Sequence, residues 1–141
     1  MSITHPDVRT IARWGLGASL LLAGTGHLTF QREEFQAQVP GWFPADADLV
    51  VVASGIAELL LGAALIASGR RRAPAVGVAA AGFFIVVFPG NIAQYVEHAD
   101  AFGLDSDAKR FTRLLFQPAL VVWALWSTGG WDRLRHRRDR E

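Results

Sequence analysis

The chain has 141 residues, of which 51% are hydrophobic and only 19% charged, and its formal net charge is +1. A soluble domain usually carries about 25% charged residues, and a nearly neutral chain has no strong field to attract nucleic acid. The chain contains no cysteine, which excludes disulfides, thiol redox chemistry and thiolate metal sites within it.

The first predicted helix, about residues 9–29, follows from a stretch between Arg13 and Arg32 that holds no charged residue. A membrane-spanning helix needs about 20 mainly apolar residues. Because no clear small-residue cleavage site follows the stretch, we interpret it as a retained helix and not as a signal peptide. His27 lies near its end. A histidine there is either a hydrogen-bonded interfacial side chain or one half of a proton-handling pair.

The second predicted helix, about residues 49–68, contains one charged residue, Glu58. At about 1.5 Å per residue Glu58 lies about 13 Å into the helix, near the middle of a bilayer. A carboxylate at that depth must be paired, hydrated or protonated. Glu58 is therefore the candidate catalytic acid or base, and Arg113 is the basic group expected to reach it. A purely structural Glu58–Arg113 pair remains the alternative.

The third predicted helix, about residues 73–95, carries Asn91 and Gln94, and the fourth, about residues 110–128, carries Arg113 and Gln117. Each pair shares one helix face, because residues three or four apart are neighbours on a helix. Since successive helices alternate in direction, the polar groups of all four helices fall in the outer half of the membrane. The predicted ligand-binding residues are His27, Glu58, Asn91, Gln94, Arg113 and Gln117.

Arginines are concentrated in the segments that would face one side of the membrane. The start of the chain, the connection 69–72 and the tail after residue 132 together hold ten of them. Because basic residues are enriched in cytoplasmic segments, we expect both termini in the cytoplasm. The expected fold is an all-α, integral membrane four-helix bundle, a single domain over residues 1–141. It would be a multi-pass protein of the cell (plasma) membrane, with the lipid bilayer as its partner.

Small residues recur four apart within three of the predicted helices, and such pairs let membrane helices approach closely. They favour a compact bundle or a dimer face, so an oligomer stays open. The pairs are Ser19 and Ala23, Ala53 and Ala57, and Gly77 and Ala81.

Five short stretches together resemble the DoxX family of small four-helix membrane proteins. They are residues 24–30 (GTGHLTF), 40–44 (PGWFP), 54–62 (SGIAELLLG), 88–91 (FPGN) and 113–117 (RLLFQ). The chain departs from the family pattern at Gly90 and Leu115. The resemblance implies site roles for His27, Glu58, Asn91, Arg113 and Gln117. It also implies a link to redox chemistry, with a quinone as the candidate cofactor and redox or membrane proteins as candidate partners.

We expect the protein to bind a small amphiphilic molecule, either a quinone or a lipid-like compound, in a redox or stress-related role. Two other classes stay open. The chain could be a structural subunit held by a buried Glu–Arg pair, or a membrane-embedded acid/base enzyme that uses Glu58. No metal site is expected, because no His-x-x-x-His spacing accompanies His27 and Glu58.

Overall fold

The computed structural model describes residues 6–31, 36, 39, 42–97 and 106–140. This part of the chain contains five helices and no strand, which confirms the all-α prediction. The helices are α1 (Val8–Leu28), α3 (Ala47–Ala67), α4 (Ala73–Val96), α5 (Asp107–Thr128) and α6 (Gly130–Arg138). The first four have bounds within three residues of the predicted ranges. The sequence analysis missed α6.

Polar residues fix where the long helices begin. Asp7 accepts a hydrogen bond from the Thr10 backbone N–H at 2.8 Å and caps α1. Asp46 caps α3 in the same way, and Ser106 caps α5. A proline occupies the first turn of α4, where its fixed φ suits a helix start and its missing N–H costs nothing. These caps satisfy backbone donors that a helix leaves unpaired at its first turn.

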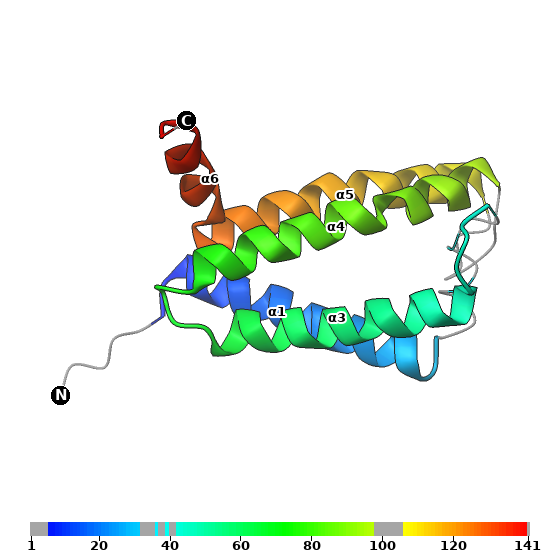
Figure 1. Ribbon diagram of the computed structural model, residues 1–141, viewed down its shortest axis with the longest axis horizontal. Coiled ribbons are helices and arrows are strands. Elements are labelled where there is room, and N and C mark those ends of the chain that lie inside the picture. Colours follow the sequence, from blue (N-terminus) through cyan, green and yellow to red (C-terminus); the bar gives the residue numbers. More distant parts are fainter. Residues whose placement is uncertain (1–5, 32–35, 37–38, 40–41, 98–105, 141) are drawn as a thin grey trace.

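The four long helices lie side by side along the length of the molecule (Figure 1). They form two pairs, because α1 packs mainly on α3 and α4 mainly on α5. The pairs meet where α1 contacts α5, and there Trp123 Nε1 donates a hydrogen bond to the Ala12 carbonyl at 2.8 Å. The buried core between the helices consists of Leu16, Leu20, Leu65, Ala80, Ala81, Phe84, Ala124 and Leu125.

Glycines form the contact between α1 and α3. A Cβ added to Gly24 would lie 2.8 Å from the Gly55 carbonyl oxygen, and one added to Gly17 would lie 2.8 Å from that of Gly62. Both helices place these glycines seven residues apart, which keeps them on one face. The predicted small-residue pairs do not form this contact. Ser19 and Ala53 are exposed, whereas Gly77 and Ala81 are buried, and a Cβ added to Gly77 would lie 2.6 Å from the Thr128 Cβ of α5.

Gly129 redirects the chain after α5. Its φ of 78° is left-handed, a conformation that glycine adopts without steric cost. Because α5 ends there, α6 points away from the long helices (Figure 1).

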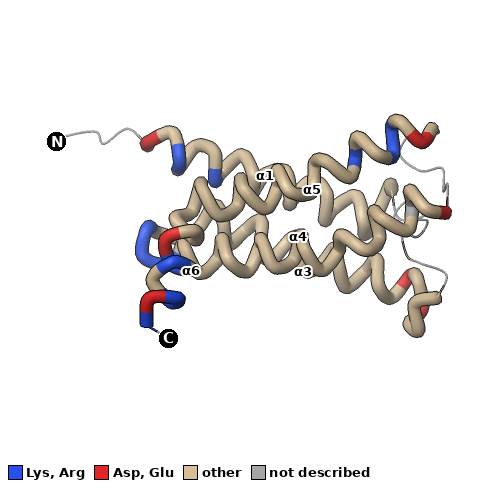
Figure 2. The backbone as a smooth tube through the Cα atoms, turned by 90° about the horizontal axis from the view of Figure 1, so that it is seen from above, with Lys and Arg blue, Asp and Glu red and all other residues tan. Residues whose placement is uncertain are grey.

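Charged residues gather towards the two ends of the molecule, and the middle is almost free of them (Figure 2). Two helices of the described chain are long and apolar enough to cross a membrane: Ala47–Ala67, and Ala73–Ala93 of α4. Only 28% of the most apolar stretch of each is buried inside the protein. Length and composition alone thus give weak support for membrane association through these two helices.

Candidate functional site

His27 and Glu58 meet between α1 and α3. The His27 Nδ1 atom lies 2.8 Å from Glu58 Oε2, and both side chains are buried, with about a tenth of their surface exposed. The same nitrogen lies 2.9 Å from the Ala23 carbonyl oxygen, one turn earlier in α1. Both neighbours are acceptors, so Nδ1 must carry the ring hydrogen.

One hydrogen cannot fully satisfy two acceptors. Glu58 Oε2 is a buried atom that no described residue supplies with a hydrogen bond, although His27 lies within ion-pair distance of it. The contact between the two side chains is therefore electrostatic in character.

Gln117 organises a second polar cluster, between α4 and α5. Its Oε1 atom accepts hydrogen bonds from Asn91 Nδ2 at 3.2 Å and from Arg113 Nη1 at 3.3 Å. Its Nε2 donates to the Phe84 carbonyl oxygen at 2.5 Å. Arginine only donates and a carbonyl only accepts, so this arrangement fixes the orientation of the Gln117 amide. Gln117 and Asn91 are both buried, and the cluster joins the two helices internally.

The predicted Glu58–Arg113 pair does not form a direct contact. Within the described chain Glu58 lies against His27, and Arg113 donates to the neutral oxygen of Gln117. The charge of Glu58 still acts on Arg113 from further away. The physical reason is the pairing of helices: α1 packs on α3, and α4 on α5, so the nearest polar neighbour of each group lies within its own pair.

Arg113 also borders a cavity of about 320 Å³ on the flank of α5. The other lining residues are Ala108, Lys109, Thr112 and Phe116. Lys109, Arg113 and the Thr112 hydroxyl thus give this cavity its polar groups. The phenyl ring of Phe116 follows about one turn further along α5.

The structure brings the six predicted site residues into two clusters and not one. The first is His27 with Glu58, and the second is Asn91, Arg113 and Gln117. Gln94 belongs to α4, but its side chain lies outside the described part of the structure. Among the described residues no three His, Asp or Glu side chains gather closely enough to hold a metal ion.

Sequence reasoning missed a third polar group at the opposite end of the molecule. Arg13 and Ser127 are buried there, beside a cavity of about 190 Å³. Arg13 was read only as a signal of orientation. Its position five residues inside the first predicted helix was the available sign that it would be covered by neighbouring helices.

Fold and sites together define an all-helical protein with two potential membrane-crossing helices and buried polar clusters. The chain belongs to a family described as a domain of unknown function (DUF8561), which matches residues 16–128. No curated protein and no solved structure matches it.

The family match corrects the DoxX resemblance, because the family found over most of the chain is DUF8561 and not DoxX. The stretches that carried the resemblance are short, and none is longer than nine residues. The quinone and the redox role rested on this resemblance and lose that support.

Proposed function

We propose that the protein is a multi-pass membrane protein in which all four long helices cross the bilayer. Helices of 21 to 24 residues are about 31–36 Å long at 1.5 Å per residue, which matches a hydrocarbon core of about 30 Å. Large apolar side chains are exposed along all four helices, among them Leu22, Leu60, Val86 and Val122. Such surface is costly in water and favourable against lipid.

The distribution of arginines supports cytoplasmic termini. The start of α1, the turn between α3 and α4, and α6 lie at one end of the molecule (Figures 1 and 2). That end carries Arg9, Arg13, Arg70, Arg71, Arg72, Arg133, Arg135, Arg137, Arg138 and Arg140. The positive-inside rule places such an end in the cytoplasm.

The function that the geometry supports best is binding of a small, lipid-like amphiphile with an anionic head group. The observation that carries it is Arg113. This side chain borders the cavity of about 320 Å³, and no described carboxylate forms an ion pair with it. Glu58 acts on Arg113 only from a distance, so an anionic head group would supply a countercharge in direct contact. The apolar tail would follow Phe116 along the lipid-facing side of α5.

A structural role is the second candidate. The His27–Glu58 contact joins α1 to α3, and the Gln117 cluster joins α4 to α5. Polar contacts of this kind hold membrane helices together without any ligand. An acid/base enzyme at Glu58 stays a prediction with no further observation in its favour.

Site-directed labelling of introduced cysteines tests the topology. Because the chain contains no cysteine of its own, each introduced cysteine is the single thiol that a maleimide can label. Single cysteines would be placed at Gly69, in the turn before α4, and at Ala108, in the first turn of α5; both positions are exposed. In intact cells an impermeant maleimide should label Ala108→Cys and spare Gly69→Cys. Labelling of both, or of Gly69→Cys alone, would refute the proposed arrangement.

Native mass spectrometry of the detergent-purified protein tests the binding function. Decanoate serves as the probe, and organic extraction identifies any lipid that co-purifies. Wild type and the exposed control Arg137→Gln should carry one amphiphile, and Arg113→Gln should lose it. Bare protein in all three samples, even with excess decanoate, would refute the binding function and favour the structural role.

A further inference from the structure

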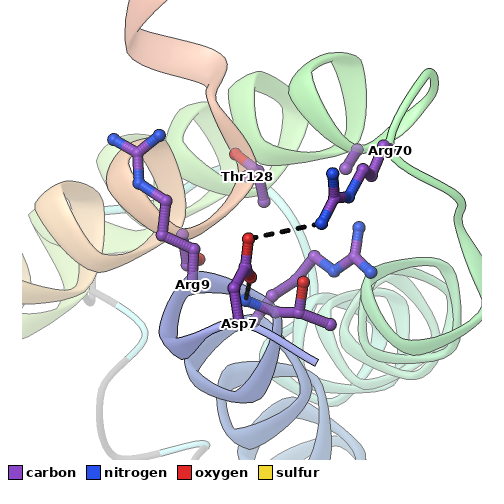
Figure 3. Close-up of a pocket in the computed structure, with 8 residues that line it drawn as sticks. Asp7, Arg9, Arg70 and Thr128 are labelled. Carbon is purple, nitrogen blue, oxygen red and sulfur yellow. Dashed lines mark hydrogen bonds and ion pairs between the residues drawn. The ribbon is translucent and has the colours of Figure 1, made fainter. Parts of the chain in front are cut away.

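A second cavity, of about 190 Å³, lies at the end of the molecule where α1 begins and α5 ends (Figure 3). The connection between α3 and α4 contributes Arg70, and the first residue of α4 completes the wall. Its lining residues are Asp7, Arg9, Thr10, Arg13, Arg70, Ala73, Ser127 and Thr128. Basic and hydroxyl side chains from three separate segments thus converge on one space.

Arg13 is the unusual member of this wall. Its residue surface is only 6% exposed, and its Nε atom has no hydrogen-bond partner. No described acidic side chain forms an ion pair with it. A buried charge without a counterion is strongly unfavourable, so a guanidinium in this state points to an anion that the protein itself does not provide.

Ser127 supplies a second unused donor. It is 5% exposed, and its Oγ atom has no hydrogen-bond partner within the described chain. The neighbouring hydroxyl of Thr128 is already engaged, since it donates to the Ala124 carbonyl oxygen at 2.6 Å and accepts from the Gly130 N–H at 3.2 Å. Of these two buried hydroxyls, only that of Ser127 is free to bind a ligand.

The remaining charges leave the cavity positive. Asp7 directs one carboxylate oxygen to the Thr10 N–H and the other towards Arg70 Nη2, at 3.5 Å. The guanidinium of Arg9 points away from both (Figure 3) and lies over the Trp126 ring, 5.7 Å from its centre. Arg13 and Arg70 against Asp7 leave one net positive charge facing the space, and Arg9 adds a second at its edge.

We propose that this cavity binds a phosphate group, with Arg13, Arg70 and Ser127 as its ligands. Guanidinium groups and hydroxyls are the donors from which phosphate oxygens accept hydrogen bonds most readily. Arg70 can give up its long contact with Asp7 for a shorter one with the phosphate. The phosphate belongs either to the head group of an anionic phospholipid or to a soluble phosphate compound. This site lies at the end opposite to the Arg113 cavity and does not depend on the function proposed for it.

Thermal unfolding of the full-length protein in detergent tests the proposal. In the first arm, sodium phosphate is titrated against sodium chloride of equal ionic strength. In the second arm, phosphatidate is added to phosphatidylcholine micelles, with phosphatidylcholine alone as the reference. The variants are Arg13→Met and Ser127→Ala, and the matched control is Arg137→Gln, an exposed arginine of α6.

The Tm of wild type and of the control should rise with the phosphate probe and not with chloride, because a ligand that binds only the folded state stabilises it. Ser127→Ala should weaken the apparent affinity about tenfold, as expected for loss of a hydrogen bond to a charged group. Arg13→Met should abolish the shift and raise the Tm in phosphate-free buffer, since it removes an uncompensated charge.

A shift in the first arm identifies a soluble phosphate compound as ligand, and a shift confined to the second arm identifies a lipid head group. The proposal is overturned if wild type responds in neither arm, or if the apparent affinity for the phosphate probe is the same in wild type, Ser127→Ala and Arg13→Met. Should Arg13→Met fail to fold, Ser127→Ala alone decides between these results.

Discussion

His27 can reach Glu58 because Gly55, one turn before Glu58 in α3, has no side chain. A Cβ at position 55 would lie 2.8 Å from the Cβ of His27, closer than two such carbons can approach. The 2.8 Å contact between His27 Nδ1 and Glu58 Oε2 therefore depends on a glycine that itself makes no polar interaction.

Substitution of Gly55 by alanine should push α1 away from α3 and weaken that contact. Overpacking of this kind lowers the free energy of unfolding by about 1–3 kcal/mol. Gly82→Ala is the matched control, since nothing lies within 4 Å of a Cβ at that position, and it should be neutral or stabilising by up to about 1 kcal/mol. Reversible unfolding in mixed micelles measures both. Equal effects of the two substitutions would contradict the close glycine contact.

Removal of the His27 imidazole should lower the free energy of unfolding more than neutralisation of Glu58 does. His27→Phe leaves a buried carboxylate without its neighbour, and breaking a buried pair in this way costs about 3–5 kcal/mol. Glu58→Gln removes the charge as well as the need for a counterion, so its free energy of unfolding should stay within about 1 kcal/mol of wild type. The same unfolding assay compares them. Similar losses in the two variants would show that the charge on Glu58 does not matter to this contact.

Gln117→Leu should loosen α4 from α5. The substitution deprives Asn91 and Arg113 of an acceptor and the Phe84 carbonyl of a donor. Each buried polar group left without its partner costs about 1–3 kcal/mol. Thr112→Val is the control, because the Thr112 hydroxyl is exposed and bonds only within its own helix. Hydrogen exchange of α4 amides should accelerate in Gln117→Leu and not in the control.

Acid should weaken the start of α1 through Asp7. Hydrogen bonds from the side chain and the backbone of Thr10 lower the pKa of the Asp7 carboxyl below its usual 3.8. A lowered pKa in the folded state gives stability that is complete above the usual value and is lost as the pH falls through the folded value. Asp7→Asn keeps a capping side chain that does not titrate. Amide exchange in the first turn should thus respond to acid below about pH 4 in wild type only.

The sequence was sufficient to predict four long helices. Charge-free stretches set their lengths, and capping residues such as Asp46 and Ser106 fix their starts. The helix α6 was missed because its nine residues are mostly charged and offer no apolar periodicity. Its existence depends on the left-handed turn at Gly129, and a glycine alone does not reveal its φ.

The members of the polar clusters were predictable, and their partners were not. His27, Glu58, Asn91, Arg113 and Gln117 stand out as polar residues in apolar helices. Which of them meet depends on the pairing and rotation of the helices, and these follow from the glycine contacts of α1 with α3. Arg113 is expected near Glu58 from its charge and its depth in the helix, whereas helix pairing brings it into direct contact with Gln117.

The glycine contact has a mechanical consequence. Gly17 and Gly24 lie against the carbonyl oxygens of Gly62 and Gly55, so the backbones of the two helices are in direct contact at these positions. Sliding of α1 along α3 would drive side chains against the opposite backbone, so these four glycines fix the register of the two helices. The same register sets His27 beside Glu58.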